Sequence, residues 1–288
     1  MSNISKKNKE KPLYISQYIL KILSYAVLII GCLSVLIPIV VILLGAFKDN
    51  KEFANTGVFE LPKSFAFDNF KTAFFEGKVL LGLRNTLLIM VVSCAGTILT
   101  GTMTAFIIQR FDGYMTRAIK GAFLLATLLP NISMQVTVFQ IISKMGLYNT
   151  MAAPIILYVG TDIISIYIFM QFLSQIPVSL DESGIMDGAS YPRIYFSIIL
   201  PNLKPAIATV LIIKFVSIYN DFYTPQLYMQ DDSLLVVSTV LYKYISSTKI
   251  QWEVVFAGII LCIIPTLLVF LFLQKYIYSG LVSGAVKE

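Results

Sequence analysis

The sequence predicts an all-α membrane protein, and its composition and hydropathy pattern both point to this fold class. Of the 288 residues, 57% are hydrophobic and only 13% are charged, whereas an ordinary soluble domain carries about 25% charged residues. The mean hydropathy is +0.79. The apolar residues form long continuous runs, and continuous runs favour membrane-spanning helices over barrel strands, which alternate apolar and polar residues.

About six transmembrane helices are expected, because six apolar runs are long enough to cross a bilayer. They lie near residues 20–47, 85–109, 118–143, 151–173, 196–219 and 254–278. The predicted organisation is a tail over 1–19, a membrane domain over 20–278 and a second tail over 279–288. The first run is too long for the core of a signal peptide, so it is expected to remain as a membrane anchor.

The basic residues predict the orientation of these helices. Short connections rich in Lys and Arg stay on the cytoplasmic side, and such residues flank the first span and the second connection: Lys6, Lys7, Lys9, Lys11, Lys21, Arg110, Arg117 and Lys120. Both termini are therefore expected in the cytoplasm, and the long connection over 48–84 outside it. This topology accounts for the net charge of +6, so lipid, and no nucleic acid, is the expected partner of the basic residues.

The sequence carries no candidate catalytic residue, metal site or cofactor site. It contains no histidine, the commonest general base and metal ligand. Cys32, Cys94 and Cys262 lie in apolar runs without a CxxC spacing and are interpreted as small buried hydrophobes. The phosphate-binding pattern G-x-x-x-x-G-K-[ST] is also missing, so the protein is predicted to be no enzyme and to bind no ATP itself.

The fourth connection, expected on the cytoplasmic side, has the pattern of two short helices. Pro177 ends the preceding helix, and Ser179 with Glu182 forms a capping box that starts a new one. Gly188 permits a turn, after which Ser190 caps a second helix. Such a compact knob suits a groove on another protein. An amphipathic loop resting on lipid headgroups is the alternative that these residues leave open.

The stretch from Glu182 to Ser190, Glu-Ser-Gly-Ile-Met-Asp-Gly-Ala-Ser, continuing through Leu200-Pro201, resembles the EAA loop of ABC-importer permeases. The resemblance places this loop over 179–205 and implies that it docks on a nucleotide-binding subunit. Ser183 and Gly184 stand where the family has two alanines, so close packing is retained while helix propensity falls. The implied ATPase-coupling residues are Glu182, Ser183, Gly184, Asp187, Gly188, Ala189, Ser190, Leu200 and Pro201.

Further stretches are similar to the carbohydrate branch of this family, namely Phe47-Lys48, Asn69-Phe70, Asn85-Thr86, Gly146 to Thr150 and Asn220 to Phe222. The resemblance implies the transmembrane domain of a type I ABC importer in a bacterial inner membrane. It also implies a homologous second permease subunit, two cytoplasmic ATP-binding subunits and an extracytoplasmic sugar-binding protein as partners. The expected function is that of a permease subunit forming half of a translocation path, with an oligosaccharide as the predicted cargo.

Polar residues within or beside the spans are candidates for the translocation path. Asp162 and Lys214 cost about 2.5–3.5 kcal/mol each at membrane depth, so they are expected to face protein or water and could pair with each other. The candidate path residues are Gln135, Gln140, Asp162, Gln171, Asn220 and Asp221. Hydrogen bonding between helices is the commoner use of such glutamines, and both uses stay open.

Two other functions fit the sequence less well. An ion-coupled secondary carrier would require inverted repeats and buried ionisable relays, for which a single intramembrane acid is thin support. A membrane-embedded enzyme would require a catalytic cluster in the spans, and Asp162 and Asp221 lack suitably spaced partners. The outer connection over 220–251 is a candidate contact for the binding protein, with a solvated loop as the alternative.

Overall fold

The chain is described by a computed structural model over residues 11–160, 162–245 and 250–285, and every regular element in these ranges is helical. Three helices are long and apolar enough to cross a membrane, and three further pairs of bent helices each have the length and composition of a span. The three long helices are α1 (Lys11–Ala46), α4 (Val79–Arg110) and α15 (Trp252–Ala285). The predicted fold class, an all-α membrane protein with about six spans, is confirmed.

Three of the expected helices are broken in the structure. The sequence predicts one helix each over 118–143, 151–173 and 196–219, but the angles at the breaks are 112°, 42° and 70°. The first break lies at Pro130, which has no backbone donor for a continuing helix. The pairs are α5 (Tyr114–Leu128) with α6 (Asn131–Lys144), α7 (Ala152–Gly160) with α8 (Ile163–Leu173), and Tyr191–Asn202 with α12 (Lys204–Asn220).

The smaller of two compact units comprises residues 1–73 and 251–260. It contains α1, α2 (Asn50–Asn55) and the first residues of α3 (Asp68–Phe75) and α15. The Asn69 amide donates to the carbonyls of Ala46 and Lys48 at 2.9 and 2.8 Å, which fixes the end of α1. Most of the large apolar side chains of α1 over 18–43 are 42–68% exposed, as expected of a helix whose solvent is lipid.

The first and last helices run past the predicted spans, and one expectation for the cysteines needs correction. Helix α1 begins at Lys11, within the predicted tail, and α15 continues past the predicted end of the last span to Ala285; residues 1–10 and 286–288 lie outside the described residues. Cys32 is exposed on α1, while Cys94 and Cys262 are buried as predicted. A lipid-facing helix exposes its small apolar residues together with its large ones, which the buried-cysteine rule for soluble proteins ignores.

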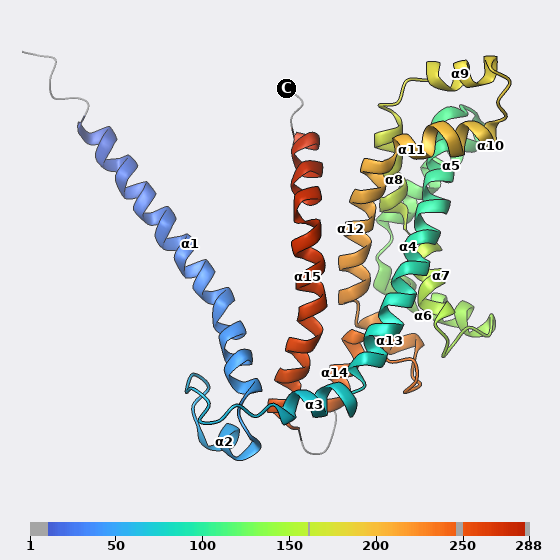
Figure 1. Cartoon of the computed structure of the whole chain (residues 1–288). Helices are drawn as coiled ribbons and strands as arrows, with labels where there is room; N and C mark the ends of the chain where they lie inside the picture. Colours follow the sequence, from blue (N-terminus) through green and yellow to red (C-terminus); the bar gives the residue numbers. More distant parts are fainter. Residues whose placement is uncertain (1–10, 161, 246–249, 286–288) are drawn as a thin grey trace, which may run out of the picture. The chain divides into compact units, whose positions relative to one another are not determined.

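The larger unit comprises residues 74–250 and 261–288, and α4 is its central helix (Figure 1). Helix α4 packs against α7, α8, α12 and α14 (Val237–Ile245). Glycines permit this close approach: a Cβ at Gly82 would lie 2.6 Å from Val240 Cγ2, and one at Gly101 would lie 2.9 Å from Phe169. Small residues at helix contacts are the usual means of tight packing between membrane helices.

The two ends of α4 carry different structures (Figure 1). One end carries α9 (Ser179–Met186), α10 (Tyr191–Ile194), the π-helical turn η1 (Tyr195–Ile199) and α11 (Leu200–Asn202). The other carries α13 (Tyr223–Tyr228) and α14. There the Asn85 amide donates to the carbonyls of Ser233 and Leu235, and Thr86 accepts from the Val237 amide. The Asn85-Thr86 motif therefore holds the connection after α13 against α4.

Candidate functional site

The turn after α9 is closed by a glycine. Gly188 has φ +77°, a conformation that side chains with a Cβ rarely adopt. Its amide donates to the carbonyl of Ile185 at 2.9 Å, and the Ala189 amide donates to the carbonyl of Gly184 at 2.9 Å. This pair of bonds is the Schellman arrangement, which satisfies carbonyls at the end of a helix and reverses the chain. The predicted turn at Gly188 is confirmed.

The start of α9 differs from the expectation. The predicted capping box between Ser179 and Glu182 is not formed, because the turn begins at Pro177 and Ser179 already has a place in the helix. The amides of Asp181 and Glu182 donate instead to the carbonyl of Val178 at 2.9 and 3.1 Å. Within the described part of the chain, no hydrogen bond or ion pair is found for the Glu182 carboxylate, which is exposed. Glu182 is thus free to meet a partner molecule.

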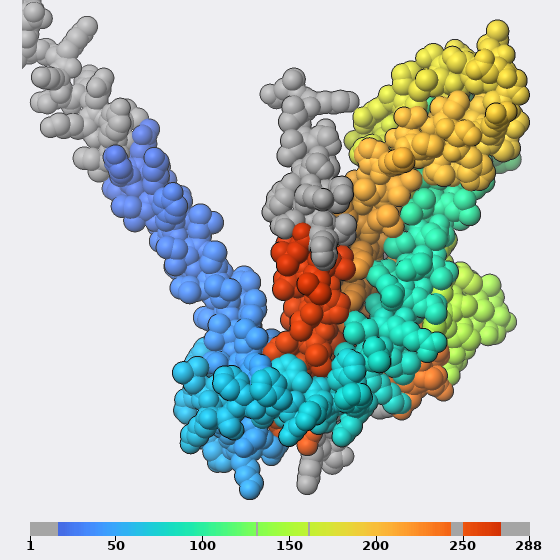
Figure 2. Space-filling view, in the orientation of Figure 1, coloured from blue at the N-terminus to red at the C-terminus, as the bar shows by residue number. Residues whose placement is uncertain are grey.

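The α9–α10 loop presents an acidic and apolar surface away from α4. Figure 2 shows this loop in yellow at the end of the larger unit. The exposed side chains include Ile185 at 47% and Met186 at 87%. Glu182, Ser183, Asp187, Gly188 and Ser190 are exposed as well, together with Pro201. Gly184 is buried against Ile194 and Ile198, while Ala189 and Leu200 are half-buried beside the core. The predicted coupling residues therefore divide into an outer surface and an inner one.

Ser190 occupies the predicted position before α10, with Pro192 in the first turn of that helix. Its side chain makes no capping hydrogen bond, so Ser190 has the position of a cap without the expected hydrogen bond.

In the connection between α4 and α5, Arg117 donates two hydrogen bonds to Asp112, at 3.0 and 2.7 Å. These bonds hold the pKa of the exposed Asp112 carboxyl below its ordinary value.

The inner surface of the loop is joined to α4 by two polar contacts. Arg110 Nε lies 2.6 Å from Asp181 Oδ2, and the two side chains are only 7% and 10% exposed. The hydroxyls of Tyr195 and Thr102 lie 2.6 Å apart in a buried position. From the sequence, Arg110 is expected to act only as a cytoplasmic basic residue that sets the topology. Two features of the sequence could have indicated this pair. Arg110 directly follows an apolar run, and Asp181 lies in a connection that is predicted on the same, cytoplasmic side of the membrane.

A second polar cluster lies at the break between α7 and α8. Lys214 on α12 lies 3.0 Å from the Asp162 carboxylate and donates to the Tyr158 carbonyl at 2.6 Å. Asp162 in turn accepts from the amide and hydroxyl of Ser165, at 3.3 and 2.5 Å, and so caps α8. The lysine and aspartate side chains are 10% and 11% exposed. The pairing that the sequence allowed is present, and the two side chains also satisfy the Tyr158 carbonyl and the Ser165 amide beside the helix break.

The other candidate path residues have varied surroundings. Asp221 accepts from the Tyr158 hydroxyl at 2.9 Å and from the Thr224 amide at 3.1 Å, so its carboxylate already has two structural partners. The exposed Asn220 donates back to the Val216 carbonyl of its own helix. Gln140 is exposed. The structure thus gives Asp221 a hydrogen bond from Tyr158 of another helix, which is the commoner use of polar residues in membrane helices, and gives Asn220 a bond within its own helix.

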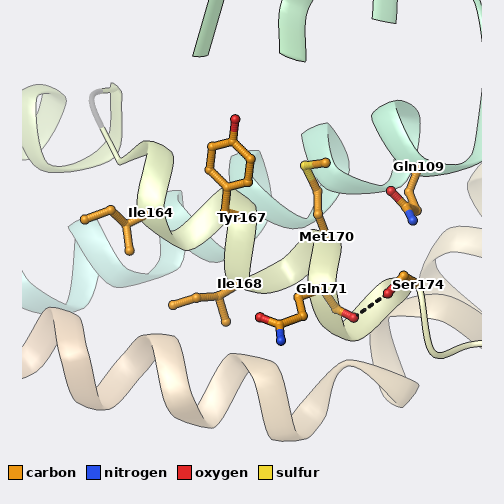
Figure 3. A pocket seen from close by; sticks show the side chains of 7 residues that line it. All are labelled: Gln109, Ile164, Tyr167, Ile168, Met170, Gln171 and Ser174. Atoms are coloured by element: carbon orange, nitrogen blue, oxygen red, sulfur yellow. Dashed lines mark hydrogen bonds between the residues drawn. The ribbon is translucent and has the colours of Figure 1, made fainter. Parts of the chain in front are cut away.

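Two of the candidate path glutamines, Gln135 and Gln171, line pockets. Gln135 accepts from the Tyr223 hydroxyl at 2.7 Å, and both side chains line a pocket of about 610 Å³ between α5, α6, α7 and α13. Gln171 lines a second pocket of about 490 Å³ along α8, together with Gln109 of α4 (Figure 3). Figure 3 shows both amides toward the same end of α8 as Ser174, whose hydroxyl donates to the Gln171 carbonyl. Sequence reasoning missed Gln109 because it closes an apolar run.

These features define a multi-pass membrane protein whose helical core carries a compact exposed loop at one end. The chain belongs to the family of binding-protein-dependent transport system inner membrane components, whose model matches residues 13–282. The resemblance found in the EAA loop and along the spans is thereby confirmed.

Two relatives and one solved structure illustrate the family. The chain is 30% identical over 255 residues to the “Probable starch degradation products transport system permease protein AmyC” of Thermoanaerobacterium thermosulfurigenes, covering 87% of this chain and 91% of that one. It is 26% identical to the melibiose/raffinose/stachyose import permease protein MelC of Bacillus subtilis, with 93% and 97% covered. The crystal structure of a bacterial ABC transporter involved in alginate import shares the fold, with a TM-score of 0.81 at 20% identity and coverage of 94% and 99%.

Proposed function

We propose that this chain is one of two permease subunits of an ATP-driven carbohydrate importer and forms half of its translocation path. The names of the two relatives refer to starch degradation products and to melibiose, raffinose and stachyose, which supports an oligosaccharide as cargo. The required partners are a homologous permease, two cytoplasmic ATP-binding subunits and an extracytoplasmic sugar-binding protein. Both chain termini lie in the cytoplasm, as the distribution of basic residues predicts.

The observation that carries this proposal is the exposed face of α9 on a chain of this family. Glu182 and Asp187 supply negative charge on it, while Ile185 and Met186 supply apolar surface. A short helix with such a face fits a groove that is apolar within and basic at its rim. Movement of the ATP-binding pair would carry the loop as a rigid body and switch the helices between outward and inward opening.

The test is the ATPase activity of the purified complex in lipid, measured with and without its binding protein and with candidate oligosaccharides. We expect one loaded binding protein to stimulate ATP hydrolysis and sugar uptake together, which would also name the cargo. If no ATPase copurifies and no sugar-dependent hydrolysis is found, the proposal fails and an ion-coupled carrier would be tested next by imposing proton and sodium gradients on the same vesicles.

Glu182→Ala tests the coupling surface directly. A charge-assisted hydrogen bond is worth about 1.5–3 kcal/mol, so we expect the amount of sugar moved per ATP hydrolysed to fall about tenfold or more in proteoliposomes. Glu76→Ala is the matched control, because Glu76 is another exposed acid of the larger unit but precedes α4 and lies outside the coupling loop. Normal coupled transport by the Glu182 variant would contradict the assignment.

A further inference from the structure

The coupling loop is connected to the rest of the larger unit in two different ways, covalent and non-covalent. Along the chain, α9 follows α8 through the non-helical residues 174–178, and α11 leads into α12 through a bend of 70°. Neither connection is a continuous helix. A displacement of α9 would therefore reach α8 and α12 through joints that can bend.

The loop's apolar side chains share one buried cluster with residues of α4, α8 and α12, whereas its polar contacts described below lead to α4. Arg110, the last residue of α4, forms its ion pair with Asp181 on α9, and its Nη2 also donates to the Ile176 carbonyl at 2.9 Å. One guanidinium thus holds both the start of α9 and the segment before it. Arg Nε and Asp Oδ2 are in close contact without the alignment of a linear hydrogen bond, so the attraction is mainly one of charge in a poorly solvated place.

The second half of the loop has its own contact with α4. The Tyr195 hydroxyl lies 2.6 Å from Thr102 Oγ1, roughly two helical turns before Arg110, and the Tyr195 ring packs on Phe106 with centroids 5.7 Å apart. Tyr195 opens the π-helical turn η1. Such turns insert one extra residue and re-aim the side chains around them, frequently at functional sites. Here the turn directs the tyrosine hydroxyl into α4.

From these contacts we propose that α4 receives the coupling motion, and that Arg110 is the positioning residue that makes α9 move with it. This inference rests on the proposed function. Because α4 packs against α7, α8 and α12, a displacement delivered to its end reaches each of these helices at once. The hydrogen bond between Tyr195 and Thr102 is a second contact that connects the η1 part of the loop to α4. Arg110 itself is too deeply placed to touch a docked subunit, since its side chain is 7% exposed.

The test measures sugar moved per ATP hydrolysed in the full complex, alongside the amount of ATP-binding subunit that copurifies. Arg110→Met is expected to lower the ratio about tenfold or more while ATP hydrolysis continues, and Tyr195→Phe to lower it by a smaller factor. Arg117→Met is the matched control: Arg117 pairs with Asp112 at the same end of α4, but the two side chains are 73% and 76% exposed. We expect no change of ratio for that variant.

A second variant separates positioning from folding. Arg110→Met leaves Asp181 buried without its cation, whereas the double variant Arg110→Met/Asp181→Leu removes both charges and is expected to assemble like the wild type. We expect the amount of sugar moved per ATP hydrolysed to stay low in this double variant, because two apolar side chains do not fix the orientation of α9 relative to the end of α4. If both variants have the wild-type ratio, or if only the amount of complex falls, the inference is overturned. A wild-type complex without sugar-stimulated ATPase would overturn the proposed function and this inference together.

Discussion

Asp162→Asn should be among the most destabilising single substitutions in the protein. Asparagine retains a side-chain oxygen that caps α8, so the substitution isolates the loss of negative charge. Lys214 would remain buried with no opposite charge 3.0 Å away. Breaking a buried pair in this manner costs about 3–5 kcal/mol. We expect a large fall in the melting temperature of the purified protein and in the yield of folded protein from the membrane.

The double variant Asp162→Asn/Lys214→Met should recover most of that loss. It removes the unpaired ammonium, although the Tyr158 carbonyl then loses the donor at 2.6 Å. Lys71→Met is the matched control for a surface pair, because Lys71 and Asp68 are 72% and 90% exposed and such pairs contribute about 0–1 kcal/mol. If Asp162→Asn and Lys71→Met had equal melting temperatures, the Asp162–Lys214 pair would have to be accessible to water.

Gly188→Val should abolish coupled transport. The φ of +77° at this position costs a residue with a Cβ about 1–2 kcal/mol, and a β-branched side chain more. Relieving that strain would break the two hydrogen bonds that close α9, from the Gly188 and Ala189 amides. The helix would then leave the loop in another direction and present Glu182 and Met186 wrongly to the ATP-binding subunit. Sugar uptake and ATP hydrolysis by reconstituted complex measure this.

Gly188→Asn provides the conservative comparison, because asparagine enters the left-handed region more readily than other side chains. We expect it to retain a substantial part of the coupled transport. Gly113→Val is a second control in a neighbouring connection, where φ is −175° and an added Cβ would meet no atom within 4 Å. Equal loss of transport in Gly113→Val and Gly188→Val would mean that the conformation of the turn is not the cause.

The sequence predicted the features that depend on local pattern. Long apolar runs required helices in lipid, and the run Met-Asp-Gly-Ala required a reversal at Gly188, because few other residues tolerate positive φ. It also allowed the pairing of Asp162 with Lys214, since two charges at membrane depth are costly unless they meet. It placed the loop whose exposed acids and apolar side chains support the coupling proposal.

Local pattern was misleading where a neighbour in space decides. The Ser179/Glu182 spacing fits a capping box, yet the turn begins at Pro177 and leaves Glu182 exposed. Likewise, the spans over 151–173 and 196–219 read as continuous apolar helices. In the structure both are broken. At the break between α7 and α8, Lys214 of α12 satisfies the Tyr158 carbonyl and the Asp162 side chain satisfies the Ser165 amide, which lowers the usual penalty for unpaired groups in lipid.

By itself, then, the sequence determined that this chain is a helical membrane protein with a chain reversal at Gly188, because hydropathy and glycine conformation act over a few neighbouring residues. Only the tertiary structure decided what holds that loop. Arg110 and Asp181 are separated by dozens of residues, and either charge alone is a sign of topology or of a helix end. Their 2.6 Å contact, in a place nearly closed to water, exists only because the fold brings α9 back to the end of α4, and this gives Arg110 the positioning role that we propose.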